Sequence, residues 1–121
     1  MPKSSRRIAR GGRLDRDHAE VQLSAIRAQV AALDYVCSGT LLKRTKVCGK
    51  PQCACASKPE ARHGPYYEWS RRENGRLAHT VLPADAVAIL QRAIKNNRRL
   101  RKLLRAWERQ SARVALATDN D

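Results

Sequence analysis

Residues 48–55 read Cys-Gly-Lys-Pro-Gln-Cys-Ala-Cys, and residues 63–67 read His-Gly-Pro-Tyr-Tyr. Thiolate and imidazole are the donors that zinc prefers, and a tetrahedral site of three cysteines and one histidine needs this inventory. Cys53 and Cys55 would point to opposite sides of a regular strand, so the segment must be turn-like if both sulfurs bind. We therefore predict a structural Zn²⁺ site that joins the two stretches. Its predicted ligands are Cys48, Cys53, Cys55 and His63.

The sequence leaves the fourth ligand open. His63 is the first choice because strand pairing could bring it back to the cysteines. His79 is a reserve, and Cys37 could complete a four-cysteine site, although its place on an apolar helical seam favours a small buried hydrophobe. The loop could also hold unmetallated or redox-active thiols, but such a cluster would be easily oxidised. Four ligands leave the metal no open position, and no catalytic motif is evident elsewhere, so we do not expect an enzyme.

The chain is short and strongly basic. It has 121 residues, no Phe, and 25 Lys+Arg against 11 Asp+Glu, for a formal charge of +14. A metal would support the thin core of one small domain. The charge favours a polyanionic partner, nucleic acid first. No apolar run approaches the ~18 residues of a membrane span, and the N-terminus lacks a secretory signal, so we expect a cytoplasmic or nucleoid-associated protein without a membrane partner.

The apolar pattern predicts an α+β fold. A helical seam predicts a helix over 14–37, and residues 40–47 read as a strand. Asn74-Gly75 predicts a hairpin between strands at 66–73 and 76–82, with Trp69 opposite Thr80 on the packed side of the sheet.

A long basic amphipathic helix should cover 84–117. We predict an N-terminal helix, a three-stranded antiparallel sheet stapled by a zinc knuckle, and this C-terminal helix. The expected organisation is a disordered basic arm (1–13), a single domain (14–117) and a tail (118–121).

Basic side chains are the candidates for contact with phosphates of DNA or RNA. They are Arg6, Arg7, Arg10, Lys43, Arg44, Lys46, Lys50, Arg98, Arg99, Lys102, Arg105 and Arg109. The alternative is an assembly role, in which the long helix forms a homodimer or docks on a larger protein or nucleoprotein complex.

The Cys-Gly-Lys-Pro-x-Cys-x-Cys stretch at 48–55 and His-Gly-Pro-Tyr at 63–66 resemble the core of a family of small bacterial proteins of unknown function. The resemblance covers about residues 39–110 and implies that the cysteines and the His-Gly-Pro-Tyr segment form one unit. It also implies an association with mobile elements, and it transfers no activity.

Overall fold

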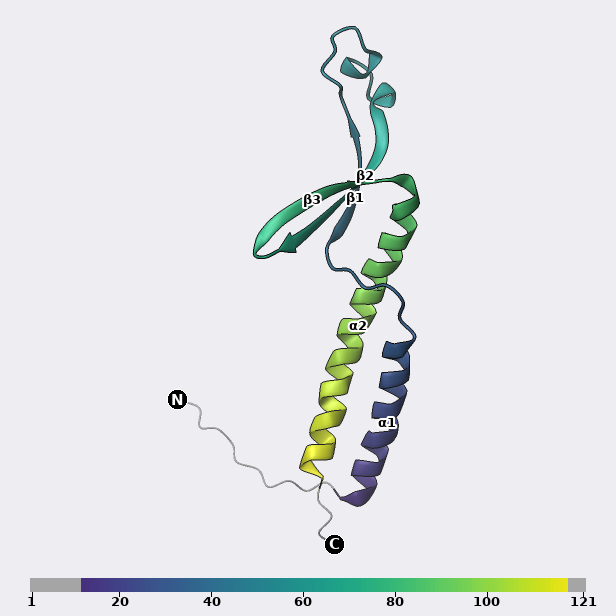
Figure 1. Cartoon of the computed structure of the whole chain (residues 1–121), viewed down its shortest axis with the longest axis vertical. Coiled ribbons are helices and arrows are strands. Elements are labelled where there is room, and N and C mark those ends of the chain that lie inside the picture. The colour runs from purple at the N-terminus through teal and green to yellow at the C-terminus, as the bar shows by residue number, and fades with distance from the viewer. Residues whose placement is uncertain (1–11, 118–121) are drawn as a thin grey trace, which may run out of the picture. The chain divides into compact units, whose positions relative to one another are not determined.

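The computed structural model describes residues 12–117 and has two long helices and a three-stranded sheet in that part of the chain (Figure 1). The predicted α+β class is confirmed. Arg6, Arg7 and Arg10, and the tail at 118–121, lie outside the described residues. No helix in the described part is both long and apolar enough to cross a membrane. The elements are α1 (Arg13–Ala31), β1 (Thr40–Lys46), the 3-10 helices η1 (Ala54–Ala56) and η2 (Pro59–Ala61), β2 (His63–Glu73), β3 (Arg76–Leu82) and α2 (Ala84–Leu116).

The sheet is antiparallel in the order β1-β2-β3, so the long strand β2 is central. Asn74 and Gly75 both have positive φ, 50° and 78°, as a type I′ turn requires. This turn sets the register of β2 against β3, and Trp69 lies opposite Thr80 as predicted.

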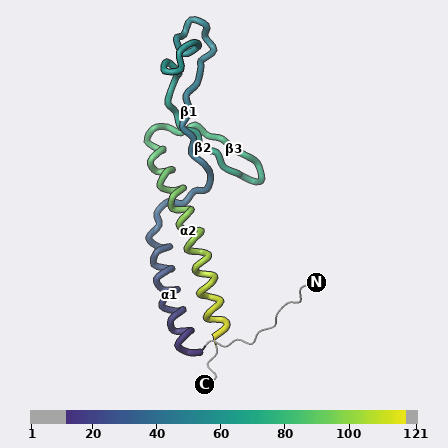
Figure 2. The backbone as a smooth tube through the Cα atoms, turned by 180° about the vertical axis from the view of Figure 1, so that it is seen from behind, coloured from purple at the N-terminus to yellow at the C-terminus, as the bar shows by residue number. Residues whose placement is uncertain are grey.

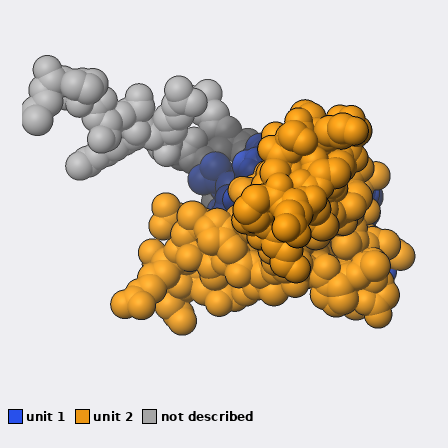
Figure 3. All heavy atoms as spheres, turned by 90° about the horizontal axis from the view of Figure 1, so that it is seen from above, with its two compact units in different colours: residues 1–34, 98–121 blue, residues 35–97 orange. Residues whose placement is uncertain are grey.

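The chain divides into two compact units, coloured separately in Figure 3. One comprises residues 35–97, with the sheet, the cysteine loop and the first part of α2. The other contains α1 and the part of α2 that begins at Arg98.

In the helical unit, α1 lies beside the C-terminal part of α2 and runs antiparallel to it (Figure 2). Asp15 at the start of α1 pairs with Arg113 near the end of α2, with 2.6 Å between carboxylate oxygen and guanidinium nitrogen. At the other end, Arg99 donates a 2.7 Å hydrogen bond to the Gln29 side chain. The apolar residues buried in this unit are Ala19, Leu23, Ile26, Leu103 and Ala117.

The first helix ends at Ala31, so the predicted extension to residue 37 is wrong. The apolar spacing continues to Cys37, but these residues bond to α2 instead of continuing the helix. The Cys37 backbone N–H donates to the Ala93 carbonyl at 3.1 Å, and the Asn96 side chain donates to the Tyr35 carbonyl at 2.9 Å. Tertiary hydrogen bonds thus override the local helical pattern.

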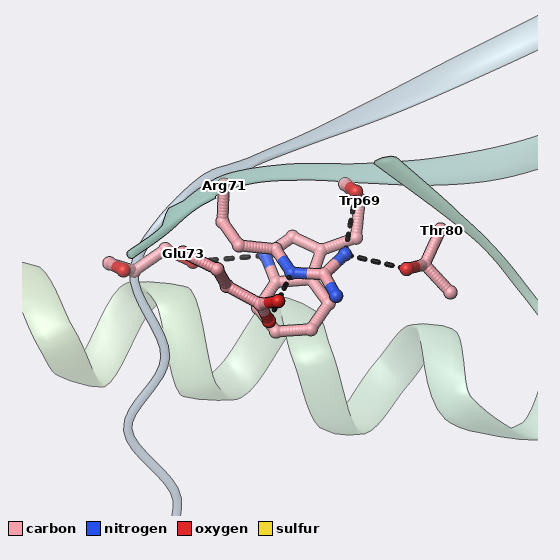
Figure 4. A network of polar contacts seen from close by, with 5 residues as sticks. Trp69, Arg71, Glu73 and Thr80 are labelled. Carbon is pink, nitrogen blue, oxygen red and sulfur yellow. Dashed lines mark hydrogen bonds and ion pairs between the residues drawn. The ribbon is translucent and has the colours of Figure 1, made fainter. Parts of the chain in front are cut away.

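Trp69 lies half-buried on the sheet, and its indole N–H donates to the Ser38 carbonyl at 2.9 Å. The guanidinium of Arg71 stacks over its ring at 4.0 Å from the centroid (Figure 4). Arg71 also donates to the Thr80 hydroxyl at 2.6 Å and to Glu73 at 3.1 Å. One face of the indole is therefore occupied by the protein's own cation.

Candidate metal centre

The cysteine loop closes one end of the β1–β2 ladder, opposite the end of β2 that leads into the turn to β3 (Figure 1). The last pair of the ladder is Lys46 with His63. Because Cys48 follows Lys46 closely, this pairing brings the histidine back to the cysteines. The strand register thus places the His63 imidazole beside the thiols, although the two are separated in the sequence.

The loop itself is turn-like, as it must be if Cys53 and Cys55 are to point to the same ion. The Cys53 backbone N–H donates to the Lys50 carbonyl at 3.1 Å, which closes a turn after Cys48. A 3-10 helix begins directly after Cys53 and contains Cys55. Cys55 is buried, at 2% exposure, whereas Cys48 is exposed at the surface.

The four candidate ligand atoms lie within 4.8 Å of one another. We call Cys48, Cys53, Cys55 and His63 the thiol–imidazole cluster. The Cys48 and Cys55 sulfurs are 3.5 Å apart, and the Cys53 sulfur lies 3.3 Å from Nε2 of His63. Zinc bonds of about 2.3 Å to sulfur and about 2.0 Å to nitrogen at tetrahedral angles would separate two sulfurs by about 3.8 Å, and sulfur from nitrogen by about 3.5 Å. The donor set and its spacing fit a tetrahedral ion.

Backbone amides favour the thiolate form of two of the cysteines. The pKa of Cys48 is lowered, first by the Lys50 backbone N–H and then by the Cys55 thiol. The pKa of Cys53 is lowered by the Cys55 backbone N–H and by the other two thiols. For Cys55 the Cys48 backbone N–H acts in the same direction, but burial and the neighbouring sulfurs outweigh it and raise the pKa. A cation is what would allow all three sulfurs to carry charge together.

Two alternative ligands lie outside the cluster. Nδ1 of His79 is 2.7 Å from the Ser70 hydroxyl and 3.3 Å from the Glu68 carboxylate. Cys37 precedes the sheet, and its backbone is bonded to α2. The grouping that the structure forms around the three loop cysteines has His63 as its fourth member.

A model of one protein family, described as a domain of unknown function (DUF6788), matches residues 13–92. The chain belongs to the DUF6788 family. No curated protein and no solved structure matches it. Membership agrees with the resemblance to an uncharacterised family, although the match begins earlier in the chain and ends earlier in the last helix. All four cluster residues lie inside the DUF6788 match, whereas α2 continues beyond it.

The basic residues predicted to meet phosphate are exposed wherever the structure describes them. Arg44 lies 3.9 Å from Glu68, and Arg99 is bonded to Gln29. Four other cations of α2 have no carboxylate within ion-pair distance in the described part of the chain. We call this set the basic stripe; it consists of Arg98, Lys102, Arg105 and Arg109.

The sequence reading missed the stack of Arg71 on Trp69. Its only signal is the two-residue spacing, which puts both side chains on one face of a strand.

Proposed function

We propose that this DUF6788 protein is a non-enzymatic, zinc-stabilised nucleic-acid-binding accessory protein. Zinc holds the loop between β1 and β2, and exposed cations contact phosphates. The observation that carries the nucleic-acid part is the basic stripe of α2. In a chain of formal charge +14, a run of exposed cations with no carboxylate partner among residues 12–117 favours a polyanion.

The geometry of the stripe suits a phosphate backbone. Its members recur at spacings of four, three and four residues, which places them on one face of the helix. With a rise of 1.5 Å per residue, Arg98 and Arg109 are about 16 Å apart along the axis. That length spans several phosphates of one strand, so each cation can meet its own phosphate.

The zinc site has a supporting part in this proposal. Four protein ligands would complete the coordination of the ion, which is typical of structural zinc. The ion would hold the ends of β1 and β2 together, beside the exposed cations Lys43, Arg44 and Lys46 of β1. Lys50 lies within the loop itself. Such contacts position a protein on nucleic acid without reading its sequence. The resemblance to proteins associated with mobile elements makes the nucleic acid of such an element the partner that we propose.

The test is the salt dependence of binding to labelled duplex DNA, measured by fluorescence anisotropy, with duplex and single-stranded RNA in parallel. If the stripe neutralises four phosphates, log K should fall against log salt with a slope of about −3.6 or steeper. That slope corresponds to a loss of about 150-fold between about 50 and about 200 mM salt.

A pair of double variants locates the contacts. Arg105→Gln with Arg109→Gln removes two stripe cations and should reduce the slope by about 1.8. Arg72→Gln with Arg76→Gln removes the same charge from exposed positions that flank the hairpin turn. The hairpin variant should leave the slope nearly unchanged. Binding that does not vary with salt, or equal effects of the two double variants, would contradict the proposal.

A further inference from the structure

The two edges of the sheet differ in how they are protected. β1 carries Lys43, Arg44 and Lys46, and its pairing is interrupted by an irregularity between Arg44 and Lys46. Charged side chains and bulges are the usual devices that keep an edge strand from pairing with another chain. β3 has neither a bulge nor a charged residue in its interior. It pairs with β2 without a break, and Arg76, at its first position, is the only Lys or Arg in the strand.

The hairpin turn determines which backbone groups of β3 face outward. In a hairpin closed by a two-residue turn, the flanking pair exchanges both backbone hydrogen bonds, and every second pair repeats this pattern. Here the flanking pair is Glu73 with Arg76. The N–H and C=O groups of Leu77, His79 and Val81 therefore point away from β2. In the described part of the chain, no backbone hydrogen bond outside the sheet involves these three residues.

These three residues form a pattern that is symmetric about its centre. Two copies of β3, antiparallel and related by a two-fold axis at His79, would place Leu77 of each copy opposite Val81 of the other. The same register pairs His79 with itself, so all three residues exchange both backbone bonds with the second strand. We propose that the protein forms a symmetric dimer by pairing β3 with β3 of a second copy.

The exposed side chains favour this partner. Leu77 is 60% exposed and Val81 is 59% exposed, and both lie on the same face of the strand. In the dimer each would gain an apolar neighbour directly across the new strand pair. The His79 ring is bonded to Ser70 and Glu68 of β2 and so leans away from the open edge. The β3 edge can therefore pair with a second copy of itself, because its free backbone groups, its register and its apolar side chains all match.

The proposed dimer does not rest on nucleic-acid binding, and the two have opposite dependences on salt concentration. Two chains of charge +14 repel each other, so added salt should strengthen the dimer by screening. Phosphate binding weakens under the same change. Either proposal can therefore fail without the other.

Sedimentation equilibrium of the full chain over a wide concentration range tests the dimer. Wild type should show a reversible monomer–dimer equilibrium. Val81→Lys should raise its dissociation constant about tenfold or more, because both apolar pairs are lost and charge enters the edge. Val21→Lys adds the same charge at an apolar position of α1 that is 65% exposed, and should change the constant less than about twofold. A protein that stays monomeric would overturn the proposal. So would equal weakening by both variants, or weakening by Val21→Lys alone, which would indicate a helix-mediated dimer.

Engineered cysteines test the register independently. Directly opposed residues of a hydrogen-bonded pair have Cα atoms about 5.5 Å apart, within the range of a disulfide. His79→Cys should therefore link to its copy when oxidised glutathione accepts the two electrons and two protons of the thiols. Leu77→Cys would lie about 13 Å from its own copy in this register and should not link above the wild-type background. Equal linking of both variants, or of neither, would refute the register.

Discussion

Cys55→Ser is the sharpest perturbation of the thiol–imidazole cluster. Cys55 is its buried member, 3.5 Å from the Cys48 sulfur, and it accepts a hydrogen bond from the Cys48 backbone N–H. Serine keeps the size and the acceptor but provides no thiolate for zinc. We expect wild type purified without chelator to hold one zinc ion per chain, and Cys55→Ser to hold none.

The size of the effect follows from linkage. A ligand that binds only the folded state, at a free concentration 100 times its dissociation constant, stabilises that state by about 2.7 kcal/mol. For a chain of this length each kcal/mol shifts the melting temperature by about 4 °C, so losing zinc should lower it by about 10 °C.

Metal analysis and calorimetry, each with and without a chelator, measure both quantities. Cys37→Ser is the matched control, because it makes the same chemical change at a free cysteine outside the cluster. It should keep the zinc and the response to chelator. A folded wild type that holds no zinc when purified without chelator would refute the metal site. Loss of zinc from Cys37→Ser would instead show that the fourth ligand is wrongly assigned.

Three further outcomes are expected. Zinc affinity should fall about tenfold or more per pH unit below neutrality, because the raised pKa of the buried thiol means that zinc must displace at least its proton; a competition titration with a coloured chelator measures this. Gly39→Ala should cost about 3 kcal/mol in denaturant unfolding, since φ is +110° and a Cβ would meet the Ser70 carbonyl. Gly75→Ala, at φ +78° with open space around it, should cost only about 1 kcal/mol. Arg71→Ala should cost about 2 kcal/mol and change the Trp69 fluorescence, because it removes the ring stack and two side-chain hydrogen bonds; an unchanged spectrum would contradict the stack.

Local rules predicted the parts of the structure that depend on local chemistry. The turn at Asn74 and Gly75 requires positive φ at both positions, and from that one constraint the register of two strands follows. The cysteine spacing likewise indicated a turn-like loop, and η1 provides it. In both cases the determining residues are close together in the chain.

The failures come from groups distant in sequence. The end of α1 at Ala31 could not be read from the residues around it. The hydrogen bonds that hold the following segment outside the helix come from Ala93 and Asn96 of α2. The choice of His63 over His79 depends on which strand pairs beside the loop, and the sequence alone left both open. The difference between the two sheet edges also appears only once the strand order is known.

The candidate metal site and the candidate phosphate-binding site lie in different units of the chain, so protein stability and phosphate binding can be tested separately. The thiol–imidazole cluster lies in the unit of residues 35–97, while the basic stripe lies on the part of α2 that packs with α1. That helical unit has its own ion pair between Asp15 and Arg113 and its own buried apolar residues. Metal removal is therefore expected to act first on the unit of residues 35–97, which holds the cluster. If the cations of α2 carry the affinity, metal removal should lower the stability of the protein and leave phosphate binding largely intact. If binding is instead lost together with zinc, the phosphate contacts must be assigned to Lys43, Arg44 and Lys46 of β1.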